Sequence, residues 1–328
     1  MRILVTGGAG FIGSNFVRCA VKKGWEVIVY DKLTYAGRLE NLNEVLSYIK
    51  FIHGDILDEG QLAKIIIDYN PNVIVNFAAE THVDRSINEP ASFIKTNILG
   101  LFSLLENVRK YDIELFLHVS TDEVYGDLWN DKEADEVYPL NPSSPYAASK
   151  AAGDLLILAY GRTYGLRYRI VRPCNNYGPY QHPEKLIPRT IIRLLHGKPA
   201  VIYGSGMQIR DWIYVEDCVE AITFVLEKGS DREIYNICAN MHACVKDIIE
   251  EIIKIMGYDP AKFIIYSKNR PGEDMKYAMK CDKIQKIGWK PKVTLYEGLR
   301  RTVKWYLENK WWWMSVIDEK YVLSDAPW

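Results

Sequence analysis

The run Gly7-Gly8-Ala9-Gly10-Phe11-Ile12-Gly13 follows an apolar stretch at residues 3–6 and precedes a segment with helical spacing at 12–23. Its glycines are spaced G-x-x-G-x-x-G. In such a loop the first glycine permits a tight turn, the second lets backbone N–H groups approach a pyrophosphate, and the third allows close helix–strand packing. The positive end of the helix dipole then faces the phosphates. The run predicts a dinucleotide-binding loop; a glycine-rich turn without a ligand is the alternative.

Outward from this loop, short apolar runs alternate with helical patterns. The predicted strands cover residues 3–6, 27–30, 50–53, 73–77, 115–120 and 168–171, and helical spacing covers 12–23, 61–69 and 90–110. Nearly continuous apolar runs are typical of strands buried on both faces of a parallel sheet. The alternation predicts an α/β fold with a doubly wound, Rossmann-type parallel sheet.

The alternation of strand-like and helical segments changes after about residue 177. Glycine and proline become frequent at 177–179 and 204–206, and helical patterns follow at 215–227 and 245–256. We predict a dinucleotide-binding domain over residues 1–176 and a second, smaller α/β substrate-binding domain over 177–328, interleaved with the first because no clean linker separates them. Residues 126–145 form the one long loop expected in the first half, and loops of that length are often functional.

Composition places the chain among ordinary globular proteins. It has 328 residues, 48% of them hydrophobic and 25% charged, and a formal net charge of -1. That charge gives no reason to expect a nucleic-acid partner. The six cysteines form no C-x-x-C pair and no zinc-like spacing, so we expect reduced core cysteines, no metal site and a cytoplasmic protein. No signal-like or membrane-spanning segment is expected.

Asp31 ends the second predicted strand, 18 residues after Gly13. An acid there accepts hydrogen bonds from the adenosine ribose and repels a 2′-phosphate, so the cofactor predicted is NAD rather than NADP. The neighbouring cations Lys32 and Arg38 keep NADP as an alternative. Asp55, after the third strand, could reach the adenine or could cap a helix.

Tyr146 and Lys150 stand four residues apart, so on a helix they share one face. Residues 143–145, Ser-Ser-Pro, suit a helix start. A nearby ammonium favours the phenolate, so we expect Lys150 to lower the pKa of Tyr146 and make it a usable base. An exposed Tyr and Lys on a helix is the alternative, but after the glycine loop and Asp31 the functional interpretation is favoured.

These residues make the chain resemble the extended short-chain dehydrogenase/reductases and, within them, the nucleotide-sugar 4,6-dehydratases that act on dTDP-glucose. The resemblance runs from residue 1 to about 313. Segments 31–37, 78–86, 120–126, 175–181, 183–188, 208–212 and 270–272 carry it. Thr121-Asp122-Glu123 is its most specific part, because a plain 4-epimerase lacks the paired acids.

The resemblance implies a lyase with bound NAD. The C4 hydroxyl is oxidised, water is lost across C5–C6, and the hydride returns to C6. Tyr146 would be the base for the C4 hydroxyl and Thr121 would hydrogen-bond that oxygen, while Glu123 would take the C5 proton and Asp122 would protonate the leaving 6-hydroxyl. Lys150 completes the catalytic set.

The resemblance also implies two binding sets. The cofactor set is Gly7, Gly10, Phe11, Ile12, Gly13, Asp31, Lys32, Thr34, Gly37, Asp55, Ile56, Ala78, Ala79, Thr96, Tyr146, Lys150 and Asn176. The substrate set is Thr81, Thr121, Asn175, Lys185, Leu186, Val201, Tyr203, Arg210, Asn236 and Arg270. Three departures from the family pattern, at Glu273 (usually His), Arg172–Cys174 and Cys238–Asn240, concern the nucleotide more than the reaction.

Two alternatives remain open at this stage. A 4-epimerase, a decarboxylating relative, or a dehydratase of another nucleotide sugar such as UDP-glucose keeps the same Tyr/Lys/NAD core. A non-catalytic NAD sensor would have no use for both the acids and the Tyr/Lys pair. We also expect a homodimer: the helix predicted at 146–164 is apolar on more than one face, as is segment 98–108, and the resemblance favours a four-helix interface built from these two segments.

Overall fold

A seven-stranded sheet forms the centre of the computed structural model, which describes residues 1–129, 132–269 and 271–325. Its strand order is β10-β6-β5-β4-β1-β2-β3, and every neighbouring pair is parallel. The strands are β1 (Arg2–Thr6), β2 (Glu26–Asp31), β3 (Ile49–His53), β4 (Val73–Asn76), β5 (Leu115–Val119), β6 (Tyr168–Pro173) and β10 (Glu233–Ile237). The predicted Rossmann-type sheet is confirmed.

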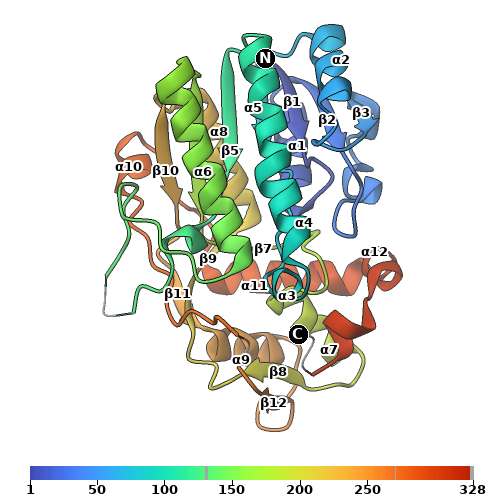
Figure 1. The fold of residues 1–328 in the computed structure, drawn as a ribbon. Helices are drawn as coiled ribbons and strands as arrows, with labels where there is room; N and C mark the ends of the chain where they lie inside the picture. Colours follow the sequence, from blue (N-terminus) through green and yellow to red (C-terminus); the bar gives the residue numbers. More distant parts are fainter. Residues whose placement is uncertain (130–131, 270, 326–328) are drawn as a thin grey trace.

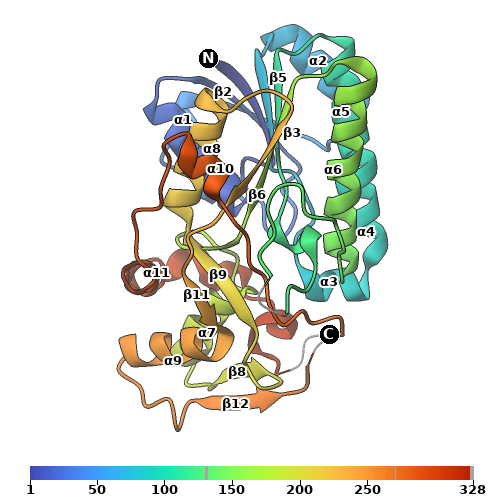
Figure 2. The same ribbon diagram turned by 90° about the vertical axis from the view of Figure 1, so that its left-hand side faces the viewer.

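Helices cover both faces of this sheet (Figures 1 and 2). One face carries α1 (Phe11–Lys22), α8 (Val215–Lys228) and α10 (Asp282–Lys286). The other carries α2 (Glu59–Tyr69), α5 (Leu101–Lys110) and α6 (Pro145–Tyr164), with α3 (Val83–Asn88) and α4 (Pro90–Ile94) beside the lower end of α6. Because both faces are covered, strands such as β5 are buried at every residue.

The helix that carries Tyr146 and Lys150 has well-defined ends. The Ser144 side chain accepts a hydrogen bond from the backbone N–H of Ala147, and Pro145 occupies the first turn, where no donor is lost. Gly165 ends the helix with φ 74°, a left-handed conformation that glycine adopts without a Cβ clash. These ends fix the register of α6 and hence the face that its tyrosine and lysine share.

All six strands predicted from the sequence are present in the large sheet; its seventh strand and the five strands of the two small sheets were missed. β10 lies well beyond the predicted boundary at 176/177, yet it pairs with β6 in the large sheet. The preceding helix α8 packs on α1. Elements beyond residue 177 therefore complete the large sheet and one of its helical layers. The domain boundary itself stays a prediction. Segment 90–110 is helical as predicted, but a π-helical turn at Lys95–Gly100 separates α4 from α5.

The remaining elements gather beyond the carboxyl ends of the large sheet (Figure 1). They form a three-stranded sheet, β11-β9-β7, and a two-stranded sheet, β12-β8. They are β7 (Asn175–Tyr177), α7 (Leu186–Leu195), β8 (Ala200–Tyr203), β9 (Ile209–Tyr214), β11 (His242–Cys244), α9 (Val245–Ile255), β12 (Ile264–Ser267), α11 (Leu295–Glu308) and α12 (Lys310–Trp313). A separate apolar core of α7, α9 and α11 side chains holds this region together.

The tryptophan-rich segment near the end of the chain belongs to that core. We expected Trp305 and Trp311–Trp313 to pack rather than to bind a ligand. Trp312 and Trp313 are buried; the indole N–H of Trp312 donates to Asn41 at 2.7 Å, and that of Trp313 donates to the carbonyl of Tyr306 at 2.8 Å. The packing role is confirmed for these two, whereas Trp311 is 56% exposed.

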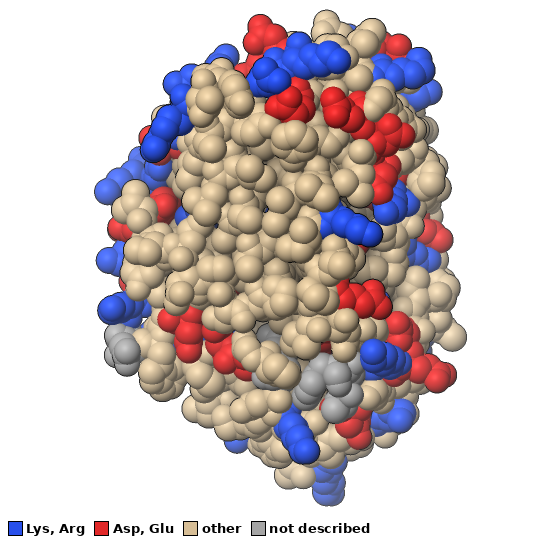
Figure 3. All heavy atoms as spheres, in the orientation of Figure 1, with Lys and Arg blue, Asp and Glu red and all other residues tan. Residues whose placement is uncertain are grey.

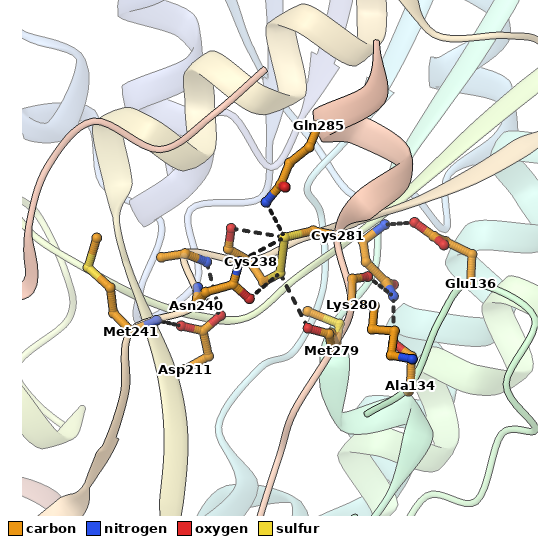
Figure 4. The surroundings of a disulfide bond; sticks show 12 residues. Ala134, Glu136, Asp211, Cys238, Asn240, Met241, Met279, Lys280, Cys281 and Gln285 are labelled. Carbon is orange, nitrogen blue, oxygen red and sulfur yellow. Dashed lines mark hydrogen bonds between the residues drawn. A yellow bond between two sulfur atoms is a disulfide. The ribbon is translucent and has the colours of Figure 1, made fainter. Parts of the chain in front are cut away.

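One expectation about the cysteines was wrong. Cys238 and Cys281 form a disulfide with a Cα–Cα distance of 5.8 Å (Figure 4). Cys19, Cys174, Cys218 and Cys244 are free. The bond joins the end of β10 to the start of α10, segments 43 residues apart in sequence. Sequence spacing indicates only local pairs, so this long-range pairing was not visible in it.

Within the described residues, no helix is both long and apolar enough to cross a membrane. The same part of the chain contains no group of three or more His, Cys, Asp or Glu side chains that could hold a metal ion.

Candidate active site

The glycine loop lies between β1 and α1 and is sterically restricted at two positions. Gly7 has φ 70°, and a Cβ there would lie 2.4 Å from the backbone nitrogen of Ala78. A Cβ on Gly13 would lie 2.3 Å from the carbonyl oxygen of Gly7. Real Cβ contacts are not that short, so both positions require glycine, as a tight strand–helix loop does.

A cavity of about 290 Å³ opens at the carboxyl ends of the central strands. Every predicted cofactor-binding residue lines it: Gly7, Gly10, Phe11, Ile12, Gly13, Asp31, Lys32, Thr34, Gly37, Asp55, Ile56, Ala78, Ala79, Thr96, Tyr146, Lys150 and Asn176. The predicted catalytic residues Thr121, Asp122 and Glu123 line it as well. Residues from many separate segments thus converge where doubly wound sheets bind ligands.

Asp31 stands at the end of β2 and is held by two backbone donors. Its carboxylate oxygens accept from the N–H of Ala9 at 2.9 Å and of Leu33 at 2.8 Å. Lys32 is paired with Asp55 at 2.7 Å, and Arg38 donates to the carbonyl of Trp312. Arg38 is therefore engaged outside the cavity, whereas Lys32 and its partner Asp55 both line it. The cap of α2 is Asp58 rather than Asp55, so the capping alternative for Asp55 was wrong.

The paired acids follow β5 in a single helical turn, Asp122–Tyr125. The hydroxyl of Thr121 lies 3.1 Å from a carboxylate oxygen of Asp122 and accepts from the backbone N–H of Glu123 at 3.3 Å. Burial, reinforced by the neighbouring charge of Glu123, raises the pKa of Asp122 to about 8. A carboxyl group that keeps its proton at neutral pH can act as a general acid.

Tyr146 and Lys150 are both buried on α6. Burial raises the pKa of the Tyr146 phenol, and the charges of Glu123 and Asp122 add to that effect, while a hydrogen bond with Thr121 opposes it. The direction is opposite to the lowering that we expected from Lys150. The amine of Lys150 instead donates to the carbonyl of Val119 at 2.7 Å, and burial lowers its own pKa to about 8.

A second cavity, of about 170 Å³, adjoins the first, and Thr81, Glu123, Asn175 and Lys185 line both. Of the predicted substrate residues, Leu186, Val201, Tyr203 and Arg210 also line this second cavity, and Thr121 lines the first. Asn236 lines neither: it is buried and bonded to the Tyr125 hydroxyl at 2.7 Å, so its substrate role stays a prediction. Arg270 lies outside the described residues.

A family model described as GDP-mannose 4,6 dehydratase matches residues 4–302 of the chain. The chain belongs to that family. A dTDP-glucose 4,6-dehydratase from Escherichia coli is 45% identical over 353 residues, covering 98% of each protein. Among solved structures, the dTDP-glucose 4,6-dehydratase of Streptomyces venezuelae with NAD bound has a TM-score of 0.94 at 44% identity, covering 97% of this chain and 100% of that one. The UDP-glucose 4-epimerase of Thermotoga maritima reaches 0.89 at 36% identity, covering 94% and 100%. Dehydratases and epimerases of this group therefore share the fold.

Several cavity residues in this family member escaped the sequence interpretation. Arg189 and Arg193 follow Lys185 at intervals of four, so one side of α7 presents three cations to the second cavity. That spacing was a usable signal. The arginines also bind the end of the chain: Arg189 donates to the carbonyl of Val322, and Arg193 pairs with Asp325 at 2.7 Å. These contacts join residues more than 130 positions apart in the chain, and such contacts leave no pattern in a single sequence.

Proposed function

We propose that the protein is an NAD-dependent lyase that removes water from dTDP-glucose and gives the 4-keto-6-deoxy product. The observation that carries the proposal is the convergence of Asp122 and Glu123 with Tyr146 and Lys150 in one cavity. The full-length similarity to dTDP-glucose 4,6-dehydratases supports the same substrate.

The chain supplies a separate group for each proton. Tyr146 takes the proton of the 4-hydroxyl, whose oxygen Thr121 holds by a hydrogen bond. Bound NAD supplies a hydride acceptor at C4 that becomes the hydride donor to C6. The 4-ketone makes the C5 proton acidic, so the Glu123 carboxylate can remove it. Asp122, which keeps its proton because of burial, protonates the leaving 6-hydroxyl as water.

The second cavity is suited to the nucleoside diphosphate part of the substrate. Lys185, Arg189, Arg193 and Arg210 line it. Guanidinium groups form forked, charge-assisted hydrogen bonds with phosphate oxygens. Asp84, Glu123, Glu184 and Glu273 line the cavity as well, and Glu273 pairs with Arg210 at 3.1 Å, so a diphosphate that binds Arg210 has to replace that ion pair. Because Lys185 and Asn175 also line the first cavity, one nucleotide sugar could extend from the second cavity to the acids.

A 4-epimerase is the competing function, favoured by the likeness to the Thermotoga maritima enzyme. An epimerase needs Tyr146 and NAD but has no elimination step for Asp122 and Glu123. Mass spectrometry of products from dTDP-glucose, UDP-glucose and GDP-mannose distinguishes the two. We expect loss of one water from dTDP-glucose; an unchanged mass with an inverted C4 would support the epimerase.

The cofactor is expected to be NAD, because the Asp31 carboxylate faces the cavity and its charge would repel a 2′-phosphate. Cofactor released by denaturation and identified by chromatography should be NAD(H). In Asp31→Asn, which keeps the shape and removes the charge, discrimination against NADP should fall about 10- to 100-fold. Recovery of mainly NADP(H) from the unmodified protein would overturn the assignment.

We infer that the protein is a homodimer that pairs through α5 and α6. The middle of this face is nearly free of charged side chains (Figure 3), and Phe102 on α5 and Leu155 on α6 are 44% and 56% exposed. Patches of this kind on a folded protein are typical of subunit interfaces. The apolar faces of two copies would meet as four helices.

Light scattering tests this assembly at micromolar concentration. The unmodified protein should have twice the chain mass of 37.8 kDa, and Phe102→Glu combined with Leu155→Glu should reduce it to one chain. Tyr266→Glu, an equally exposed site on β12, is the matched control and should leave the dimer intact. A monomeric unmodified protein would refute the proposal.

A further inference from the structure

Residues 318–325, which we call the C-terminal segment, lie against helix α7 and hold two of its arginines. Arg189 donates to the carbonyl of Val322 at 3.3 Å and to that of Ser324. Arg193 donates to the same carbonyl of Ser324 at 3.1 Å. Backbone acceptors of one short segment therefore fix the direction of both guanidinium groups.

The C-terminal segment is itself held in place. Tyr321 and Val322 are buried, and Val322 belongs to the apolar core that includes α7. The carboxylate of Asp318 accepts from the backbone N–H groups of Lys320 at 2.9 Å and of Tyr321 at 3.4 Å, which caps the turn that follows. Asp318 also pairs with Arg85 at 3.4 Å. The segment thus presents its carbonyl oxygens to the two arginines in a defined arrangement.

The two arginines differ in how their charge is balanced. Arg193 pairs with the carboxylate of Asp325 at 2.7 Å, and its Nε–H donates to the carbonyl of Pro199 at 2.7 Å. Arg189 also donates to the hydroxyl of Tyr203, but no carboxylate in the described part of the chain pairs with it. Carbonyl and hydroxyl oxygens accept its protons without balancing its charge. Since Arg189 is only 7% exposed, it is a buried cation without an anion.

This cation faces the second cavity, because Arg189 lines it whereas no described residue of the C-terminal segment does. Two acids of the same cavity are engaged with other cations: Glu184 pairs with Arg85 at 2.9 Å, and Glu273 pairs with Arg210 at 3.1 Å. Buried charges in proteins are nearly always paired. A buried cation that lacks a partner and lines a cavity therefore indicates an anionic ligand.

We infer that Arg189 binds the diphosphate group of a nucleotide in the second cavity and that the C-terminal segment positions it. Asp325 neutralises Arg193, so Arg193 anchors the segment and the ligand role falls to Arg189. The inference rests on the proposed function for the identity of the nucleotide sugar, whereas the charge argument requires only a nucleoside diphosphate. The residues that the family model matches end at 302, so the family pattern gives this segment no role.

Calorimetric titration with dTDP, UDP and GDP tests the ligand role, because all three carry the diphosphate. Arg189→Gln keeps an amide that can donate to the segment and removes the charge. The dissociation constant of whichever nucleotide binds the unmodified protein should therefore rise about 10- to 100-fold. An unchanged constant, or no binding of any of the three by the unmodified protein, would overturn the inference.

Arg169→Gln is the matched control for that variant. Arg169 is similarly buried and also donates to two backbone carbonyls, but it lines neither cavity. Its replacement should leave nucleotide binding unchanged. Thermal unfolding of both variants shows that the proteins compared are folded.

Asp318→Ala tests the positioning role without touching either arginine. It removes the cap of the segment and the pair with Arg85, and the Asp318 side chain is 40% exposed, so no buried site is altered. The dissociation constant should rise about 3- to 10-fold. The same change made in Arg189→Gln should add nothing, because the segment acts through Arg189.

The control for this second variant is Asp58→Ala, which removes the exposed cap of α2 and should leave binding unchanged. An unchanged constant in Asp318→Ala would contradict the inference even if Arg189→Gln failed to fold. An equal effect of Asp318→Ala with and without Arg189 would show that the segment does not act through that arginine.

Turnover separates the inference from the proposed function. Both Arg189→Gln and Asp318→Ala should raise KM for dTDP-glucose and leave kcat within about two-fold, because the diphosphate is held equally before and during the reaction. A fall in kcat without a rise in KM would contradict the inference. An unmodified protein that binds dTDP but does not dehydrate dTDP-glucose would contradict only the proposed function.

Discussion

Glu123→Gln and Asp122→Asn are expected to stop elimination while leaving oxidation of the substrate intact. Tyr146 and the cofactor cavity are unchanged in both variants, so the hydride should still leave C4. Each amide removes one of the two groups that elimination requires, a base for C5 or a proton for the 6-hydroxyl. General acid–base groups contribute about 10²–10⁴-fold in rate, so product formation should fall by that order.

A single-turnover absorbance trace separates the two steps. In both acid variants NADH should accumulate on mixing with dTDP-glucose, because C6 no longer becomes a hydride acceptor. Tyr146→Phe is the matched control: without the phenol, NADH should scarcely form. If both acid variants made product at the unmodified rate, the dehydratase proposal would fail and the epimerase would replace it.

The raised pKa of Asp122 also predicts how the rate of elimination depends on pH. Because burial raises it to about 8, the carboxyl group is protonated below that pH and ionised above it. The rate of elimination by the unmodified enzyme should therefore fall as the pH rises through about 8. Asp122→Asn has no proton to lose, so its residual rate should not show this limb.

The sequence predicted the large sheet because buried parallel strands leave a continuous apolar signal. The run Phe116-Leu117 in β5 is fully buried, and residues buried on both faces of a parallel sheet are mostly apolar. β10 was missed because Glu233–Ile237 is short and its apolar run is interrupted by Asn236, a polar residue that is nevertheless buried. The order of the strands, with β10 beside β6, depends on pairings that periodicity does not carry.

The candidate site likewise has features that the sequence predicted and features that it did not. Gly7 and Gly13 were predictable because steric limits at a tight loop restrict the residue type itself. The effect of Lys150 on the pKa of Tyr146 was not predictable, because it depends on where the amine points. That direction is set by Val119 and His118 on β5. The spacing of Tyr146 and Lys150 along the helix predicts that they are neighbours. Their protonation states depend on all the groups that contact them, which the spacing does not show.

The disulfide between Cys238 and Cys281 is expected to contribute about 4 kcal/mol to the free energy of unfolding. It closes a loop of 43 residues, and a cross-link of that span restricts the unfolded chain by roughly this amount in the chain-entropy model. The bond also fixes the loop after β10, whose N–H groups at Ala239 and Met241 donate to Asp211 at 2.9 and 2.7 Å (Figure 4).

Asp211 follows Arg210, which lines the second cavity, so loosening this loop should also weaken nucleotide binding. Urea unfolding of the oxidised protein and of Cys238→Ser/Cys281→Ser measures the first effect, and titration with dTDP measures the second. Reductant should destabilise the unmodified protein by the same amount and leave the double variant unaffected. Cys244→Ser, at a free cysteine on β11, is the control and should change little. Six reactive thiols in the unfolded, unreduced protein would show that the bond does not form, and the predicted stabilisation would then be absent.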